Sequence, residues 1–138
     1  MSGDLLDVIL LDTDVVSFLF KGDTRAASYA PLLEDHRLAI SFMTVAELFQ
    51  WAAIHKWGAP RVRLLEAALQ EYVVVPFNLE LCRLWGEIRA RGRQAGRPIS
   101  PQDAWVAATA LLHGLPLATH NPKDYELLEE LEIVTAAV

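Results

Sequence analysis

Residues 8–14 read VILLDTD, and this short stretch decides which kind of fold the chain can adopt. Four branched apolar residues lead directly into Asp12 and Asp14, and a second apolar run, VVSFLF, begins at residue 15. A short run of branched apolar residues predicts a buried strand, here over residues 7–12. Two carboxylates at the end of a buried strand are costly to desolvate unless other groups compensate them. The stretch therefore predicts a strand that ends at a site of special chemistry.

Apolar runs alternate with helical patterns along the rest of the chain. Further strands are expected at residues 37–42, 72–77, 116–120 and 132–138. Helices are expected at residues 15–22, 24–35, 44–58, 60–72, 78–96, 101–114 and 121–132. Strands that alternate with helices predict a parallel sheet covered on both faces. We therefore expect a single α/β domain over residues 1–138, with a central, mostly parallel sheet of four to five strands flanked by helices.

Composition and charge exclude several classes of protein. A chain of 138 residues is long enough for one domain with a hydrophobic core. The net charge of −6 opposes attraction of the whole surface to nucleic acid, and the single cysteine, Cys82, excludes a disulfide within the chain. The apolar runs are too short to span a membrane, and the segment MSGDLLD carries acids where a secretory signal carries bases. We therefore expect a cytoplasmic protein with no membrane partner.

Five acidic residues lie just after predicted strands or at the starts of predicted helices. They are Asp12, Asp14, Glu47, Asp103 and Asp124. The last three follow a Thr, Ser or Asn by three residues, which is the offset of a capping box, so each one alone could simply stabilise a helix start. In an open parallel sheet, however, the carboxyl ends of the strands meet at one crevice. The sequence therefore predicts that the five acids converge.

Converging carboxylates need a compensating charge. At an effective dielectric constant of about 20, like charges a few ångströms apart repel by several kcal/mol, whereas helix capping recovers only about 0.3–1 kcal/mol. A divalent cation compensates the charge, and oxygen ligands without His or Cys favour Mg²⁺ or Mn²⁺. Such an ion activates a bound water and stabilises in-line displacement at phosphorus. Since no glycine-rich phosphate loop is present, the pattern predicts phosphodiester hydrolysis rather than nucleoside triphosphate hydrolysis.

Three segments carry a resemblance to a known family. In chain order, LLDTDVVSFL, TVAELFQWA and ISPQDAWVAATALLHGLPLATHNPKDYE resemble the PIN-domain ribonucleases. They look most like the VapC-type toxins of bacterial toxin–antitoxin pairs, and the resemblance extends from about residue 8 to about residue 134. It implies a PIN-like fold and a Mg²⁺-dependent endoribonuclease that cuts RNA.

The resemblance also implies roles for the acids. Asp12, Glu47 and Asp103 fall on the family's three main acidic positions. Asp12 and Asp103 are expected to hold the metal, and Glu47 to complete the site or position the attacking water. Asn121 or Asp124 fills the fourth position, and we favour Asp124 as a ligand, through a water or directly. The expected products are a 5′-phosphate and a 3′-hydroxyl.

Two residues near the main acids differ from the family pattern, and two others are expected to support Asp12. Asp14 stands where many members have Asn, which adds a negative charge, and Tyr125 replaces a more usual Phe. Thr13 and Ser17 are expected to lie near Asp12 and to orient it.

A basic stretch precedes Asp103 in the sequence. The segment RARGRQAGR holds four arginines, at positions Arg89, Arg91, Arg93 and Arg97. They could bind RNA phosphates beside the acidic site, or they could form a solvated helix end, and the sequence leaves both interpretations open.

The helix expected at residues 44–58 is apolar on two sides. Trp51, Ile54 and Trp57 lie on a different side from Val45 and the other core-facing positions. A helix that is apolar on two sides is either deeply buried or part of an interface. The resemblance implies a cognate antitoxin protein and a homodimer, so we predict that these three residues form a partner interface.

Other functions fit parts of the sequence. An Asp-x-Asp after the first strand also occurs in phosphotransferases of the haloacid-dehalogenase type, which would leave Glu47 without a role. A phosphorylation-receiver domain needs an acceptor Asp after the third strand, where this chain reads VPFNLE. An RNA-processing nuclease of the PIN fold outside toxin–antitoxin systems, or a catalytically silent PIN-fold binding module, remains an alternative.

Overall fold

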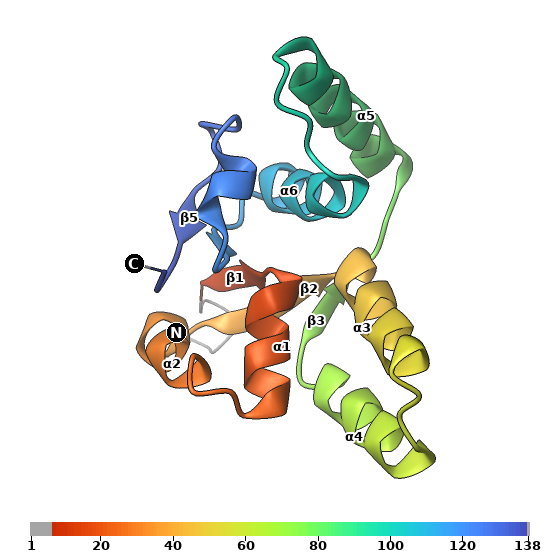
Figure 1. The fold of residues 1–138 in the computed structure, drawn as a ribbon. Helices are drawn as coiled ribbons and strands as arrows, with labels where there is room; N and C mark the ends of the chain where they lie inside the picture. Colours follow the sequence, from red (N-terminus) through yellow and green to blue (C-terminus); the bar gives the residue numbers. More distant parts are fainter. Residues whose placement is uncertain (1–6, 138) are drawn as a thin grey trace.

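The computed structural model describes residues 7–137, and a parallel sheet runs through its centre (Figure 1). The sheet has five strands: β1 (Val8–Leu11), β2 (Arg37–Ser41), β3 (Val73–Val75), β4 (Leu117–Ala118) and β5 (Ile133–Val134). Their order is β3-β2-β1-β4-β5, and every neighbouring pair is parallel. The predicted α/β class and parallel sheet are confirmed.

Helices cover both faces of this sheet. They are α1 (Thr13–Lys21), α2 (Ala26–Leu33), α3 (Phe42–Ile54), α4 (Ala59–Leu69), α5 (Leu79–Gln94) and α6 (Pro101–His113). Helices α5 and α6 lie on one side of the sheet and α1 to α4 on the other (Figure 1). Each face of the sheet has its own hydrophobic core, and alternate residues of β1 point into one or the other. Leu10 packs under α6, whereas Ile9 and Leu11 pack against α1 and α3. No helix within residues 7–137 has the length and apolar character needed to cross a membrane.

The helix predicted at residues 121–132 is wrong. Only the short 3₁₀ helix η2 (Pro122–Tyr125) forms there, followed by turns. Asn121 does not cap it, because its side chain donates to Asp14 instead. The chain must also reverse direction after η2 so that β5 can pair with β4. The apolar residues whose spacing resembles that of a helix, such as Leu128, are instead buried in turns.

Of two helix caps that the sequence suggests, the structure contains one. Ser100 caps α6 as expected, since its hydroxyl accepts a hydrogen bond from the Asp103 backbone N–H at 3.1 Å. The predicted cap at Thr44 is wrong. Ser41 accepts from Met43 N–H at 3.0 Å and starts α3 two residues earlier, which leaves Thr44 buried inside the helix.

The strand order reverses beside β1, which has β2 on one side and β4 on the other. In open parallel sheets a crevice forms beyond the strand ends at such a reversal. Asp12 directly follows β1 and Thr119 directly follows β4, so both lie at this crevice. The topology alone therefore places Asp12 at the expected position of a site.

Candidate active site

Asp12 lies at the bottom of the crevice with both carboxylate oxygens held. Its Oδ1 accepts from the Thr13 backbone N–H at 2.9 Å. Its Oδ2 accepts from the Thr119 hydroxyl at 2.8 Å and from the Tyr125 hydroxyl at 2.9 Å. Burial raises the pKa of Asp12, whose residue is only 8% exposed, and these three hydrogen bonds oppose the rise. The side chain is therefore fixed in one orientation and short of positive charge.

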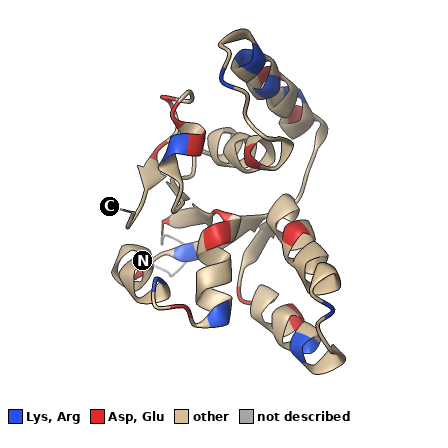
Figure 2. Cartoon of the chain, viewed as in Figure 1, with Lys and Arg blue, Asp and Glu red and all other residues tan. Residues whose placement is uncertain are grey.

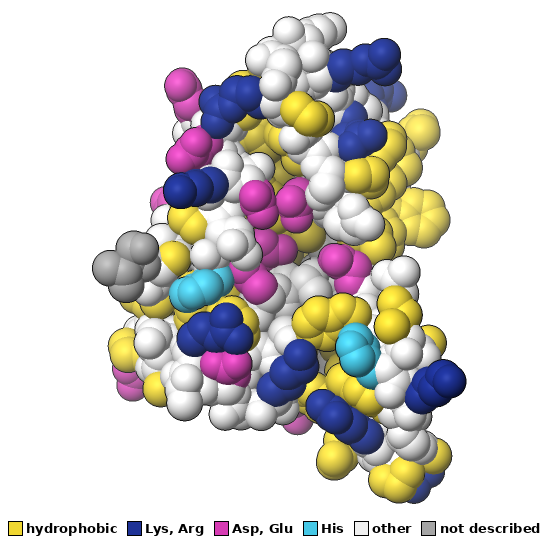
Figure 3. Space-filling view, in the orientation of Figure 1, with side chains coloured by type: hydrophobic (Ala, Val, Ile, Leu, Met, Phe, Trp, Pro, Cys, Tyr) yellow, Lys and Arg dark blue, Asp and Glu magenta, His cyan; other side chains and the backbone are white. Residues whose placement is uncertain are grey.

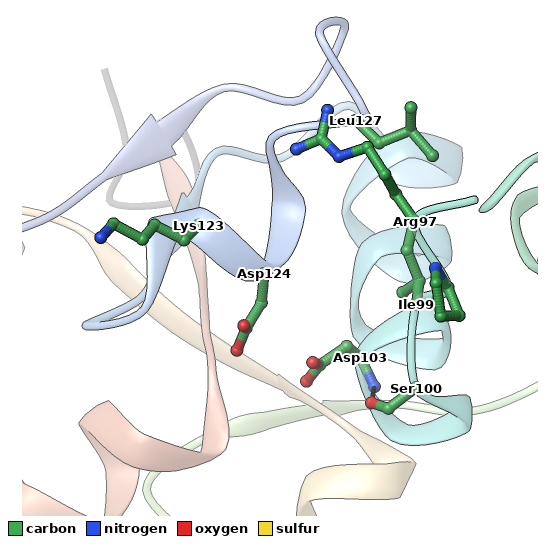
Figure 4. A pocket seen from close by; sticks show the side chains of 8 residues that line it. Arg97, Ile99, Ser100, Asp103, Lys123, Asp124 and Leu127 are labelled. Atoms are coloured by element: carbon green, nitrogen blue, oxygen red, sulfur yellow. Dashed lines mark hydrogen bonds between the residues drawn. The ribbon is translucent and has the colours of Figure 1, made fainter. Parts of the chain in front are cut away.

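Asp103 and Asp124 face a common cavity of about 350 Å³. Figure 4 shows their carboxylates pointing toward one another, one from the first turn of α6 and the other from η2. Burial raises the pKa of Asp103 to about 6, and the charges of Asp12 and Asp124 add to the effect. The cavity is lined by Arg97, Pro98, Ile99, Ser100, Asp103, Lys123, Asp124 and Leu127.

Glu47 reaches the same site from α3. The Thr13 hydroxyl donates to Glu47 Oε1 at 2.8 Å and shares a further hydrogen bond of 3.0 Å with the Thr44 hydroxyl. Burial raises the pKa of Glu47, and the charges of Asp12 and Asp103 contribute. Thr13 therefore orients two acids at once, Asp12 through its backbone and Glu47 through its hydroxyl.

The expected role of Ser17 finds no support in the structure. Ser17 is buried within α1, and no hydrogen bond joins it to Asp12 among the contacts of residues 7–137.

Asp14, at the start of α1, is hydrogen-bonded to the turn that follows β4. Its Oδ2 accepts from the His120 backbone N–H at 3.0 Å and from the Asn121 side-chain amide at 2.9 Å. Burial and the charge of Asp12 raise the pKa of Asp14 to about 6. Of the two candidates for the fourth acidic position, Asp124 faces the cavity and Asn121 is bonded to Asp14.

The acids lie around one crevice, and within residues 7–137 no ion pair joins any of them to a cation. Figure 3 shows acidic side chains gathered in the middle of one face, and Figure 2 places them on α1, α3, α6 and η2. In the described part of the chain the ion pairs are Arg25–Asp23, Arg91–Glu130 and Arg97–Glu126, none of which includes an acid of the crevice. The crevice therefore has an excess of negative charge, although Arg97 and Lys123 line the cavity that Asp103 and Asp124 face.

The donor set fits a partly hydrated Mg²⁺ or Mn²⁺. Across residues 7–137 no three acidic, His or Cys side chains stand close enough to share one ion directly. Mg²⁺ usually binds through one or two carboxylates and keeps several waters, so widely spaced carboxylates suit it. The charge of Asp12 contributes to the raised pKa of Asp103, and the Tyr125 hydroxyl contacts both carboxylates, so these two acids lie close together in the site.

Three of the four predicted RNA-binding arginines make contacts within the chain. Arg89 donates to the Ile99 carbonyl at 2.7 Å, Arg91 to Glu130 and to the Leu127 carbonyl, and Arg97 to Glu126. These contacts tie α5 to the segments around the cavity, and Arg97 also lines it. Arg93 is exposed near the end of α5.

Sequence reasoning missed two residues of the site. Lys123 lines the cavity beside Asp124, and its place next to a predicted acid was a signal that could have identified it. Tyr125 stands out in the sequence only as a replacement of a more usual Phe, yet its buried hydroxyl donates to Asp12 and, at 3.3 Å, to Asp103. The signal was a hydroxyl at a buried position next to the acids.

The residues of the predicted partner interface differ in exposure. Trp51 and Ile54 are 39% and 62% exposed on α3, and Lys21 Nζ lies 4.1 Å from the centre of the Trp51 ring. Trp57 instead stacks on Phe20 with ring centres 5.8 Å apart. Trp57 therefore contributes more to packing than its two neighbours do.

Comparison with known proteins agrees with this fold and site. Residues 9–134 match the PIN domain family. The chain is 30% identical to Ribonuclease VapC1 of Haemophilus influenzae (strain R2866) over 127 residues, which cover 91% of this chain and 95% of that protein. It is 26% identical to the tRNA(fMet)-specific endonuclease VapC of Shigella flexneri, covering 85% and 89%.

Solved structures agree as well. The structure of VapBC-1 from nontypeable Haemophilus influenzae superposes with a TM-score of 0.79 at 29% identity, covering 93% of this chain and 97% of that chain. VapBC2 from Rickettsia felis, bound to a DNA fragment from its promoter, gives 0.81 at 22% identity, with coverage of 93% and 98%. The chain belongs to the PIN domain family, and within it to the VapC ribonucleases. The haloacid-dehalogenase and receiver-domain alternatives are thereby excluded.

Proposed function

We propose that the chain is a Mg²⁺- or Mn²⁺-dependent endoribonuclease and the toxin of a toxin–antitoxin pair. The observation that carries the proposal is the set of unneutralised acids at the reversal of the strand order, in a chain related to VapC ribonucleases. The match to residues 9–134 supports one nuclease domain, and we propose that this domain acts in the cytoplasm. The name of the Shigella flexneri relative makes transfer RNA the first substrate to test.

Four of the five acids have a task in this proposal. Asp12 and Asp103 would hold the ion, and Asp124, which faces the same cavity as Asp103, would be a further ligand, directly or through a water. Glu47, oriented by the Thr13 hydroxyl, positions the water that attacks phosphorus. When bound, the ion would lower the pKa of a water and offset the negative charge that develops at phosphorus.

RNA approaches this site through the cavity. Arg97 and Lys123 line it and offer positive charge to the phosphates that flank the cut. Arg89 and Arg91 support the cavity wall through their carbonyl contacts, so we assign them a smaller share in RNA binding, and Arg93 is left as a peripheral contact.

We also propose an antitoxin partner and a homodimer. The VapBC-1 structure supports the first, because it contains a relative of this chain in a VapBC assembly. The exposed side chains of Trp51 and Ile54, together with the adjoining Trp57, are the proposed interface. A PIN-fold nuclease that acts in RNA processing, or a silent binding module, is the alternative.

Cleavage of structured RNA by the purified chain tests the proposal. Wild type, Asp12→Asn and Asp103→Asn are compared in Mg²⁺, in Mn²⁺ and in excess chelator. Glu129→Gln is the matched control, since Glu129 is an exposed acid outside the crevice. We expect metal-dependent cutting by wild type and Glu129→Gln only. If the folded, partner-free wild type cuts no RNA with either metal, the binding module becomes the better interpretation.

A further inference from the structure

The hydroxyl of Tyr125 lies between two acids that come from different parts of the fold. Asp12 follows β1 and Asp103 lies in the first turn of α6, and Tyr125 belongs to η2. The phenol oxygen is 2.9 Å from Asp12 Oδ2 and 3.3 Å from Asp103 Oδ1. One side chain thus joins the two carboxylates that the proposed function assigns to the ion.

Packing alone does not account for this hydroxyl. Tyr125 is 1% exposed, and a Phe ring would fill the same space without a polar atom. A buried hydroxyl is costly unless it is hydrogen-bonded, and here the available partners are the two carboxylates. A phenol carries its proton at neutral pH whereas a carboxylate only accepts, so Tyr125 acts as the donor.

The contacts of Tyr125 leave definite oxygens free for a ligand. At Asp12, Oδ2 accepts two hydrogen bonds and Oδ1 accepts one, so Oδ1 keeps a lone pair. At Asp103, Oδ1 is the oxygen near the phenol, while the carboxylate as a whole faces the cavity. The phenol proton also reduces the repulsion between the two charges, which favours their close approach before any ion binds.

We propose that Tyr125 is a positioning residue of the metal site, which holds Asp12 and Asp103 in the arrangement that accepts the ion. The inference rests on the proposed function, because it takes these two acids as direct ligands. Tyr125 itself contacts neither the ion nor the RNA, and it acts through the carboxylates that it joins.

Calorimetric titration of Mn²⁺ into the metal-free full chain tests this role. The variant is Tyr125→Phe, which keeps the ring and removes the hydroxyl. Tyr29→Phe is the matched control: Tyr29 is fully buried, and its hydroxyl contacts His120 Nδ1 and the Thr119 carbonyl rather than a carboxylate. We expect the dissociation constant to rise about tenfold in Tyr125→Phe, as for other residues that orient metal ligands, and less than about twofold in Tyr29→Phe.

The outcomes separate the inference from the proposed function. If wild type binds no Mn²⁺, the metal-dependent function itself fails. If wild type binds Mn²⁺ and Tyr125→Phe binds it equally well or more tightly, the positioning role is overturned, even if the melting temperature falls. Thr119→Val provides a second comparison, because it removes the other donor to Asp12 Oδ2 but keeps the link to Asp103. We expect it to lose less affinity than Tyr125→Phe, and an equal or larger loss would overturn the importance of the link.

Discussion

The pKa values of Asp103 and Asp14 show how burial beside other acids affects single residues. Burial and neighbouring acids raise the pKa of both from 3.8 to about 6. An acid with a raised pKa binds its proton more tightly in the folded chain than in the unfolded one. The resulting stabilisation is complete below the unfolded pKa of 3.8 and is lost as the pH rises through about 6.

We therefore expect the metal-free protein to become less stable as the pH rises from about 4.5 to about 7. Melting temperatures measured across this range in the presence of a chelator check the prediction. Mg²⁺ should restore stability mainly at the upper end, because it binds the ionised carboxylates. A melting temperature that rises steadily with pH in chelator would contradict the shifts in Asp103 and Asp14.

Replacing Asp103 by Asn should separate stability from activity. Asn keeps the shape of the side chain but removes a charge that Asp12 and Asp124 repel. We expect the metal-free variant to be more stable by about 1 kcal/mol, which corresponds to a melting temperature roughly 3–6 °C higher, and to lose RNA cleavage. Glu129→Gln should change neither quantity. Equal or lower stability in Asp103→Asn would show that its charge is compensated in the folded chain.

Helix α5 depends on a close backbone contact near its end. A Cβ atom at Gly92 would lie 2.9 Å from the Arg97 carbonyl oxygen and 3.1 Å from the Ile99 nitrogen, whereas one at Gly86 in the same helix meets nothing within 4 Å. The contacted backbone leads directly into Ser100 and the start of α6. Gly92 therefore sets the distance between α5 and the segment that carries Asp103.

The two glycines should respond to alanine in opposite directions. We expect Gly92→Ala to lower the free energy of unfolding by about 1–3 kcal/mol, because backbone must move to admit the methyl group. Gly86→Ala should raise it by about 1 kcal/mol through better helix propensity. Denaturant unfolding of both variants checks this. Equal effects in the two would mean that the contact of Gly92 with Arg97 and Ile99 is easily relaxed.

Which elements could be predicted depended on how local their causes are. The strand β1 and the Ser100 cap of α6 are set by neighbouring residues, and both were predicted correctly. The prediction of a helix at residues 121–132 is wrong because distant contacts determine this segment. The side chain of Asn121 donates to Asp14, and the chain must bring β5 beside β4. Local pattern is reliable where no tertiary contact competes with it.

The same distinction holds for the site when the whole molecule is considered. Convergence of the acids follows from parallel topology, so the sequence could predict it. The partners of Arg91 and Arg97 lie about thirty or more residues away in the chain, and the hydroxyl of Tyr125 meets Asp12 across 113 positions. Such contacts depend on how α5, α6 and η2 pack, which residue spacing does not determine.

At the scale of the whole molecule, exposed apolar side chains lie on two separate surfaces. A groove between α3, α4 and β3 is lined by Val45, Phe49, Glu66, Leu69, Gln70, Tyr72 and Val74. Ile54 is exposed further along α3. Leu79, at the start of α5, is 77% exposed on a different element. Ile54 and Leu79 are a matched pair for substitution, because each has a large, exposed aliphatic side chain.

We expect association of the chain to depend on Ile54 and not on Leu79. An Asp at an interface core loses hydration without gaining a partner, so Ile54→Asp should convert a homodimer to a monomer at micromolar concentration. Light scattering coupled to size-exclusion chromatography measures the mass, and unchanged melting temperatures confirm that both variants fold. If Leu79→Asp gives monomers and Ile54→Asp does not, self-association uses the surface around the start of α5, and the α3 surface remains for an antitoxin alone. A wild-type chain that stays monomeric would count against the homodimer itself.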